Sequence, residues 1–504
     1  MKIKKIVGKD IKSWHPFKKG YSSDQYYLRI ANLLQDRFYS INIDVKDNTE
    51  EVFHETAILL TKYMEDIMAD CGIWRMFSEQ CQQLYGHPVP MYHEQEEYYP
   101  DEPSKNAIRY LIWSTISNIT DEIVSTDGDA IERMATHAYD ILNELFDEAP
   151  VNEQLAEDLT NFVKQSEKGF DDMRAVLMWI YTDCYLTNGK RNEELLMEHT
   201  EEGIDMLSNE HMMASPGMTF FYAVTHCIFQ YKTGPLALYA KDYLALLMRQ
   251  RGMDRLATNL EHMERIHAGI YKYEFIKEDR LLLTRTNGRK IEIQAKELNL
   301  KKKELEQHDG CMASSFVNYQ KEWHLNGILM PLEKTTEKWE RLCENDPDNL
   351  KPGTETLTAD KMLKRTKGQR IAYFADREQM KDWLVEKIQF PRHMVGFVDE
   401  QGGEQPTIFI DTEEPKNCLQ FFFGYSHCIA DPSNPYYDQK DAKERAINML
   451  WNAESVTTHA MNYMLDMGYL PDIYRDMVFS RHNTTEQTRK DIDFLMRFWR
   501  QEKY

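Results

Sequence analysis

The stretch that most constrains the fold is residues 269–298, where strand and turn patterns agree along the whole length. Tyr271 and Tyr273 lie two residues apart in a run of alternating side chains, which is the period of a β-strand. A second apolar run follows a polar turn, and Asn287-Gly288 is the dipeptide favoured by two-residue hairpin turns of type I′. The stretch therefore predicts three antiparallel strands.

Two further extended runs follow, at 316–319 and 323–332. Asn326-Gly327 in the second run predicts another hairpin turn. Five short strands within 269–333 indicate a small, partly open barrel of the SH3 or OB kind. Barrels of this kind bind peptides or oligonucleotides, or have no ligand.

The segments on either side of this unit differ in their patterns. Upstream, helical stripes succeed one another without a fixed repeat, which favours an irregular helical domain over a solenoid. Downstream, short strand patterns mix with helical ones. We therefore predict an α+β fold with three domains: a mainly α-helical N-terminal domain with a basic arm at 1–268, a small antiparallel β-barrel-like domain at 269–333, and a C-terminal α+β domain with long C-terminal helices at 334–504.

Within the C-terminal domain, the sequence predicts one long helix over 438–467, because a seam of seven residues, four of them alanine, recurs there at alternating steps of four and three, as in a heptad pattern. The seam residues are Ala442, Ala446, Met449, Ala453, Val456, Ala460 and Tyr463. A last helix is predicted from Thr485. The predicted strands of this domain are 370–374, 393–398, 407–410 and 418–425.

The charge of the chain is strongly negative, with a formal net value of −22. Nucleic-acid binding depends on Lys and Arg contacts to phosphates, so this charge disfavours a generic nucleic-acid binder. The first twenty residues are an exception, with seven Lys and one Asp. We predict that this basic arm lies on the acidic body of the protein, and the alternative is a contact with RNA or another phosphate.

The sequence predicts a cytoplasmic protein. Lysines interrupt every candidate signal peptide at the N-terminus, and no uncharged apolar stretch is long enough to span a bilayer. The eight cysteines form no C-x-x-C pair, so neither a zinc knuckle nor a disulfide framework is indicated. We expect no membrane association, and the sequence does not determine the oligomeric state.

The strongest candidate for a metal site is an acidic loop rich in histidine. Imidazole and carboxylate groups are suitable ligands for zinc or iron. Pro88 and Pro90 exclude a helix here, so the two histidines cannot share a helix face as in an H-E-x-x-H motif. A solvated acidic loop is the alternative. The candidate ligands are His87, His93, Glu94, Glu96 and Glu97.

A second group, His427, Cys428 and Asp431, follows an apolar strand and contains the residue types of a thiol nucleophile with its base. Neighbours in an extended chain point to opposite sides, so His427 is badly placed to activate Cys428. A strand end with a buried cysteine is the preferred interpretation. The sequence also contains no phosphate loop, dinucleotide fingerprint or nucleophile elbow, so we assign no catalytic residue and no cofactor-binding residue.

Modular architecture and missing motifs together favour a non-catalytic binding protein. We expect its partner to be a protein, held in the groove between the barrel and the helices. Two alternatives stay open: a metal-dependent hydrolase that acts through the His87 to Glu97 loop, and RNA binding through the barrel and the N-terminal lysines. Whether the protein is an enzyme is left undecided by the sequence.

Overall fold

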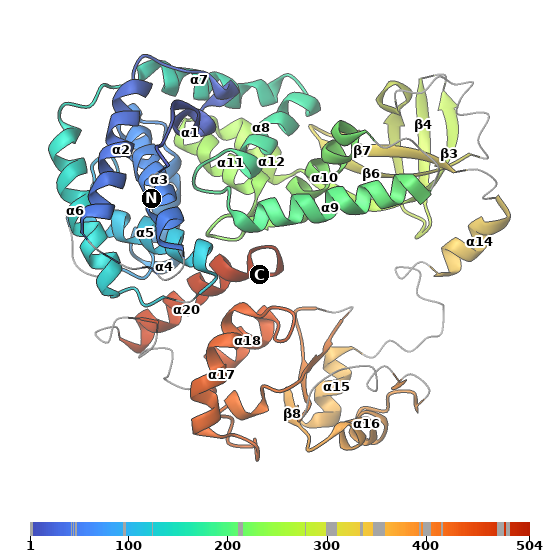
Figure 1. The fold of residues 1–504 in the computed structure, drawn as a ribbon. Helices are drawn as coiled ribbons and strands as arrows, with labels where there is room; N and C mark the ends of the chain where they lie inside the picture. The colour runs from blue at the N-terminus through green and yellow to red at the C-terminus, as the bar shows by residue number, and fades with distance from the viewer. Residues whose placement is uncertain are drawn as a thin grey trace.

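The computed structural model describes the chain as three connected parts (Figure 1). A helical body, formed by α1 to α12, is followed by a β-barrel and then by a smaller α+β part. The predicted α+β fold class is confirmed. The described residues are 4–41, 43, 45, 48–93, 97–122, 124–209, 215–277, 279–298, 310–332, 336–345, 358–392, 395–396, 405–414, 417–470, 478–479 and 484–504.

Some helices of the helical body begin at a polar side chain that accepts a backbone hydrogen bond. Ser104 accepts from the N–H of Ala107, and Asn152 accepts from that of Leu155, so each caps the helix that follows it. None of the described helices is long and apolar enough to cross a membrane. The helices are α1 (Gly8–Ile11), α2 (Asp24–Ser40), α3 (Thr49–Ala69), α4 (Ile73–Tyr85), α5 (Lys105–Thr120), α6 (Asp129–Phe146), α7 (Glu153–Lys164), α8 (Phe170–Thr182), α9 (Lys190–Asn209), α10 (Pro216–Gln230), α11 (Ala240–Gln250) and α12 (Asp254–Glu261).

The basic N-terminal segment is folded against the helical body, as predicted. Trp14 is fully buried in the core. Lys18 pairs with Asp183 at 3.1 Å, and Lys19 pairs with Asp158 at 2.5 Å. Acidic residues of the protein itself therefore neutralise these two lysines.

The five predicted strands form a barrel, but this barrel is closed rather than partly open. Its strand order is β3-β4-β5-β7-β6, and β3 also pairs with β6. Closure follows from the length of β3, since one half pairs with β4 and the other with β6. One pair, β5 with β7, is parallel. The strands are β3 (Glu264–Lys277), β4 (Arg280–Arg285), β5 (Lys290–Gln294), β6 (Cys311–Tyr319) and β7 (Glu322–Leu332).

Both predicted hairpin turns of the barrel differ in the structure. Only Gly288 of Asn287-Gly288 has a positive φ, of 82°, so this turn is not of type I′, which needs two such residues. Asn326-Gly327 lies inside β7, and the chain reverses instead at Gln320-Lys321, with φ of 53° and 69°. A tertiary contact explains the difference, because buried Asn326 donates a hydrogen bond to the carbonyl of Thr225 on α10, at 3.0 Å.

The C-terminal part contains a three-stranded antiparallel sheet with order β10-β9-β8. The predicted strand at 393–398 lies mostly outside the described residues, and Val395 and Gly396, which are described, are not in a strand. The elements are α14 (Thr336–Asn345), α15 (Ala359–Thr366), β8 (Ile371–Tyr373), α16 (Arg377–Glu386), β9 (Thr407–Ile410), β10 (Leu419–Phe422), α17 (Gln439–Trp451), α18 (Thr458–Asp466) and α20 (Thr485–Arg500).

The single long helix predicted over 438–467 was wrong, because the chain forms α17 and α18 with a break between them. Thr457 begins the second helix by accepting a hydrogen bond from the N–H of Ala460. The alanine seam is nevertheless buried at Ala446 and Ala460, since apolar spacing determines which side faces the core even where the helix is interrupted.

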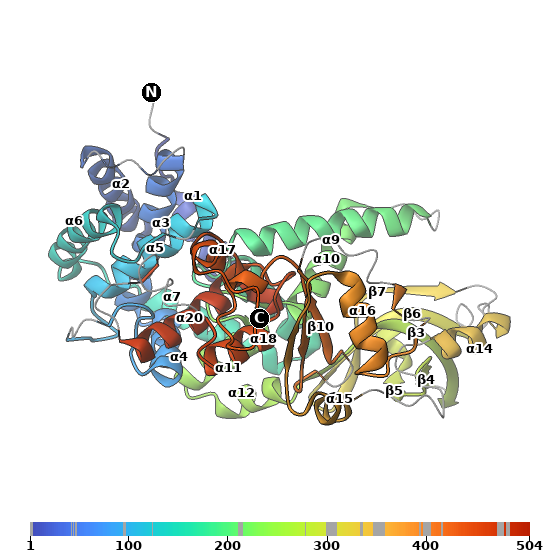
Figure 2. The same cartoon turned by 90° about the horizontal axis from the view of Figure 1, so that it is seen from below.

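The last helix, α20, returns to the helical body and lies beside α4 in both views (Figures 1 and 2). Its Phe498 ring lies 4.8 Å from that of Trp113, and its Phe494 ring lies 6.0 Å from that of Tyr85. Residues from opposite ends of the chain therefore share one core.

Gly234 provides a test of packing within the helical body. Its φ is 63°, and an added Cβ would lie 2.8 Å from Tyr243 Oη and 3.2 Å from Thr187 Cα. We expect Gly234→Ala to lower the free energy of unfolding by about 2–3 kcal/mol, from backbone strain and steric overlap together. Gly252→Ala is the control, because Gly252 has a similar φ of 68° but open space around it. Chemical denaturation measures both, and equal losses would contradict the steric argument.

Candidate functional site

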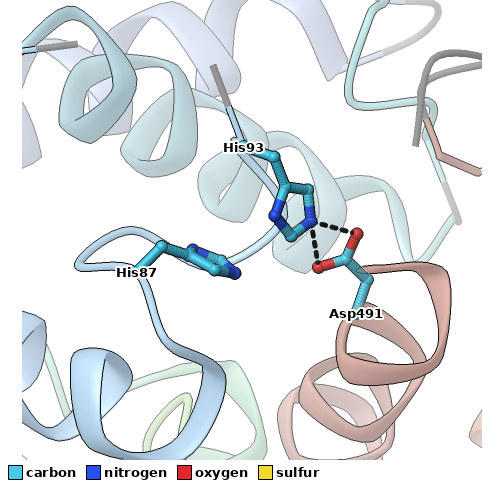
Figure 3. Close-up of side chains that lie close together, drawn as sticks. All are labelled: His87, His93 and Asp491. Carbon is cyan, nitrogen blue, oxygen red and sulfur yellow. Dashed lines mark hydrogen bonds and ion pairs between the residues drawn. The ribbon is translucent and has the colours of Figure 1, made fainter. Parts of the chain in front are cut away.

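His87, His93 and Asp491 meet where the loop after α4 contacts α20 (Figure 3). One potential ligand atom from each residue lies within 4.8 Å of the other two. The two imidazole rings are 4.3 Å apart between centroids. The site therefore unites a local pair of histidines with a carboxylate from the far end of the chain.

The His87 ring is oriented by its own loop. Gly86 ends α4 with φ of 84°, and His87 Nδ1 then donates a hydrogen bond to the carbonyl of Val89 at 2.6 Å. This bond assigns the proton to Nδ1 and leaves a lone pair on Nε2. Nε2 is buried and has no hydrogen-bond partner among the described residues. Burial, followed by the charge of His93, lowers the pKa of His87 to about 4, so the ring is neutral near pH 7.

His93 is held by the carboxylate of Asp491. Its Nε2 lies 2.9 and 3.0 Å from the two carboxylate oxygens. Asp491 is almost fully buried, and burial raises its pKa, opposed by His93 and by the backbone N–H of Met91. A buried acid beside a histidine needs a positive partner to stay ionised, and either a protonated His93 or a cation can supply that charge.

Both histidines line a cleft of about 480 Å³, which we call the histidine cleft. Tyr98 and Gln487 also line it, and Lys490 contributes a positive charge, with its Nζ 3.3 Å from Glu486. A small molecule in this cleft would therefore reach the imidazoles directly.

Two imidazole nitrogens and one carboxylate oxygen are a suitable donor set for Zn²⁺ or Fe²⁺. Two ligands each about 2.1 Å from one tetrahedral ion lie roughly 3.4 Å apart. His93 Nε2 and Asp491 are 2.9 Å apart, the distance of a hydrogen bond, so ion binding would separate them by roughly 0.5 Å. Binding would require His93 to carry its proton on Nδ1, and three protein ligands would leave a coordination position for water.

Of the five predicted ligands, the structure brings together His87 and His93. Glu97 is not part of this cluster, because its side chain is exposed and accepts a hydrogen bond from Tyr99 Oη at 2.5 Å. Glu94 and Glu96 lie outside the described residues. The sequence analysis did not identify Asp491. This carboxylate lies beside Ile492, on the apolar side of a predicted helix, where a charged residue is unusual, and that position could have identified it.

The second sequence candidate is not an activated thiol. Cys428 is fully buried, and burial raises its pKa to about 11. Asp431 accepts hydrogen bonds from Tyr373 Oη and from the hydroxyl of Ser433. A thiolate is thus disfavoured, and the expected buried cysteine is confirmed.

A family described as "Protein of unknown function (DUF3843)" matches residues 5–280 and 341–500. These two segments contain His87, His93 and Asp491. No curated protein and no solved structure matches the chain.

Proposed function

The chain belongs to the DUF3843 family of proteins of unknown function, and we propose that it is a metal-dependent hydrolase whose ion is bound by His87, His93 and Asp491. The observation that carries this proposal is the buried Nε2 of His87, which has a free lone pair and faces the other two residues (Figure 3). Leaving a buried polar atom unsatisfied costs about 1–3 kcal/mol, and a bound cation would remove this penalty. All three residues also lie within the segments that match the family.

The chemistry of the histidine cleft supports hydrolysis. A bound divalent ion supplies a Lewis acid and an activated water molecule. Lys490 would hold an anionic group of the substrate, and the phenol rings of Tyr92 and Tyr98 would cover its apolar part. A small phosphate ester fits this combination of charges best.

Metal binding is the first test of this proposal. Calorimetric titration of chelator-treated protein with Zn²⁺, Mn²⁺ or Fe²⁺ should give one site per chain. We expect His87→Ala, His93→Ala and Asp491→Asn each to weaken this binding by about 100-fold or more, because each removes one ligand. Glu97→Gln is the matched control from the same loop and should bind the ion as tightly as the wild type.

Activity is tested with p-nitrophenyl phosphate after metal loading. The wild type and Glu97→Gln should release nitrophenol, and His87→Ala should not. A wild type that binds the three ions no more tightly than His87→Ala would rule out the metal site. Stoichiometric metal without any metal-dependent hydrolysis of phosphate esters would rule out the hydrolase.

A second candidate function is non-catalytic binding in the groove between α10 and the barrel. Its support is a hollow of about 160 Å³, lined by residues that include Tyr222, Ile270 and Met330. A protein partner held by apolar contacts should bind with little dependence on salt, whereas RNA bound through the barrel and the N-terminal lysines should lose affinity steeply as salt increases.

We also propose a cytoplasmic location. All eight cysteines are free thiols, and seven of them are buried. This usage is typical of a reducing compartment.

A further inference from the structure

A second cleft, of about 880 Å³, opens in the helical body, and none of the described residues that line it also lines the histidine cleft. We call it the serine cleft. Its lining comes from the N-terminal segment, α3, α5 and the segment between α8 and α9. Ser13 and Lys62 both line it.

Ser13 and Lys62 are in direct contact within this cleft. Lys62 Nζ donates a hydrogen bond to Ser13 Oγ at 2.7 Å, and the Ser13 hydroxyl donates to the carbonyl of Asp10 at 2.9 Å. A neutral Lys62 would accept the hydroxyl proton after rotation about the Cβ–Oγ bond of Ser13. Both side chains are half-buried, so they are shielded from bulk water and still reach the cleft. The tertiary fold creates this contact, since Ser13 belongs to the N-terminal segment and Lys62 to α3.

Lys62 loses its proton more easily in this cleft than a lysine does in water. Burial lowers the pKa of Lys62 to about 8, although the carboxylates of Glu55, Asp10 and Asp183 oppose this shift. A neutral amine has a lone pair that can accept the proton of a hydroxyl group. A lysine at hydrogen-bond distance from a serine can therefore act as its base.

We propose that Ser13 and Lys62 form a nucleophile and general-base pair that transfers acyl groups from esters. Ser13 Oγ would attack the ester carbonyl carbon while Lys62 Nζ accepts the hydroxyl proton. This proton then passes to the leaving oxygen as the ester C–O bond breaks. The acyl group stays on Ser13 Oγ until a water molecule, deprotonated by Lys62, attacks its carbonyl carbon. The bond from this carbon to Ser13 Oγ then breaks, the carboxylic acid leaves, and Lys62 returns the proton to Ser13 Oγ.

The charge of the serine cleft indicates the substrate class. Five carboxylates and two lysines line it, and one of these lysines, Lys190, pairs with Asp121. The cleft therefore favours esters of neutral or cationic alcohols over anionic substrates. The lining of the histidine cleft is less acidic, since it contains one carboxylate, Glu486, and one lysine, Lys490.

Acylation of the full-length protein by p-nitrophenyl acetate tests the pair. We expect one acetyl group per chain, located on Ser13 by peptide mass spectrometry. Ser13→Ala should lose this modification, and Lys62→Arg should slow it by about 100-fold or more, because an arginine keeps the charge but does not act as a base at neutral pH. Ser40→Ala and Lys164→Arg are controls at exposed positions outside the cleft.

The wild type alone provides a second measurement, which does not depend on any variant folding. The rate of Ser13 acylation should rise with pH and reach half its maximum near pH 8, the pKa of Lys62. Removal of metal by a chelator should leave this rate unchanged, which separates the serine cleft from the proposed metal site. Acetylation of Lys62 instead of Ser13, or acetylation that Lys62→Arg does not slow, would overturn the proposal, as would a wild type that is never acylated.

Discussion

Replacement of Arg500 by methionine is expected to lower the free energy of unfolding by about 3–5 kcal/mol. Arg500 lies at the end of α20 and is 1% exposed. Its guanidinium donates to the carbonyls of Met449 at 2.6 Å, Leu450 at 2.8 Å and Val456 at 2.8 Å. Methionine fills a similar volume but would leave these buried acceptors without their donor.

The position of these carbonyls explains the large effect. Met449 and Leu450 lie in the last turn of α17, where carbonyl groups have no partner within the helix and carry the negative end of the helix dipole. Arg500 supplies both hydrogen bonds and charge, and it also holds the break between α17 and α18.

Urea-induced unfolding measures this effect, with Arg489→Met as the control on the same helix. Arg489 is half-exposed and pairs with Asp466, so its replacement should change the free energy by less than about 1 kcal/mol. Equal stability of Arg500→Met and the wild type would show that water replaces the guanidinium at these carbonyls.

Asp66→Asn should produce the second large loss, of about 2–4 kcal/mol. Asp66 is 1% exposed and accepts hydrogen bonds from the backbone N–H groups of Ile73 and Trp74, at 3.1 and 2.6 Å, and from Tyr185 Oη at 2.7 Å. The carboxylate thereby caps the first turn of α4 and joins it to the segment after α8. An asparagine amide replaces one acceptor oxygen by a donor, which would face other donors.

Asp70→Asn is the control for this substitution. Asp70 ends α3 with φ of 52°, a conformation that asparagine also tolerates, and its side chain is 69% exposed. Its ion pair with Arg75 lies on the protein surface, so we expect the free energy of unfolding to change by no more than about 1 kcal/mol. If Asp66→Asn were no less stable than Asp70→Asn under the same denaturation protocol, the capping role of Asp66 would be refuted.

Apolar spacing identified the type of most elements correctly. The alternation around Tyr271 identified the barrel, and the spacing of Ile492, Leu495, Met496 and Trp499 identified the last helix. Errors arose where a distant contact decided between local alternatives. Asn326-Gly327 has the composition of a turn, yet its contact with Thr225 keeps it inside β7. The predicted long helix of the C-terminal part is likewise interrupted at the point where Arg500 donates hydrogen bonds to the buried carbonyls of Leu450 and Val456.

The candidate site also combines a part that local sequence predicts with a part that tertiary packing decides. The sequence by itself determined that His87 and His93 lie in one non-helical loop, because Gly86 and the prolines act on the backbone within a few residues of themselves. Only the tertiary structure decided that Asp491, 398 residues beyond His93, completes the cluster and that Glu97 does not. Local backbone preferences depend on neighbouring residues and can therefore be predicted from a sequence. The meeting of two distant segments depends on how whole helices pack, and no local pattern specifies it.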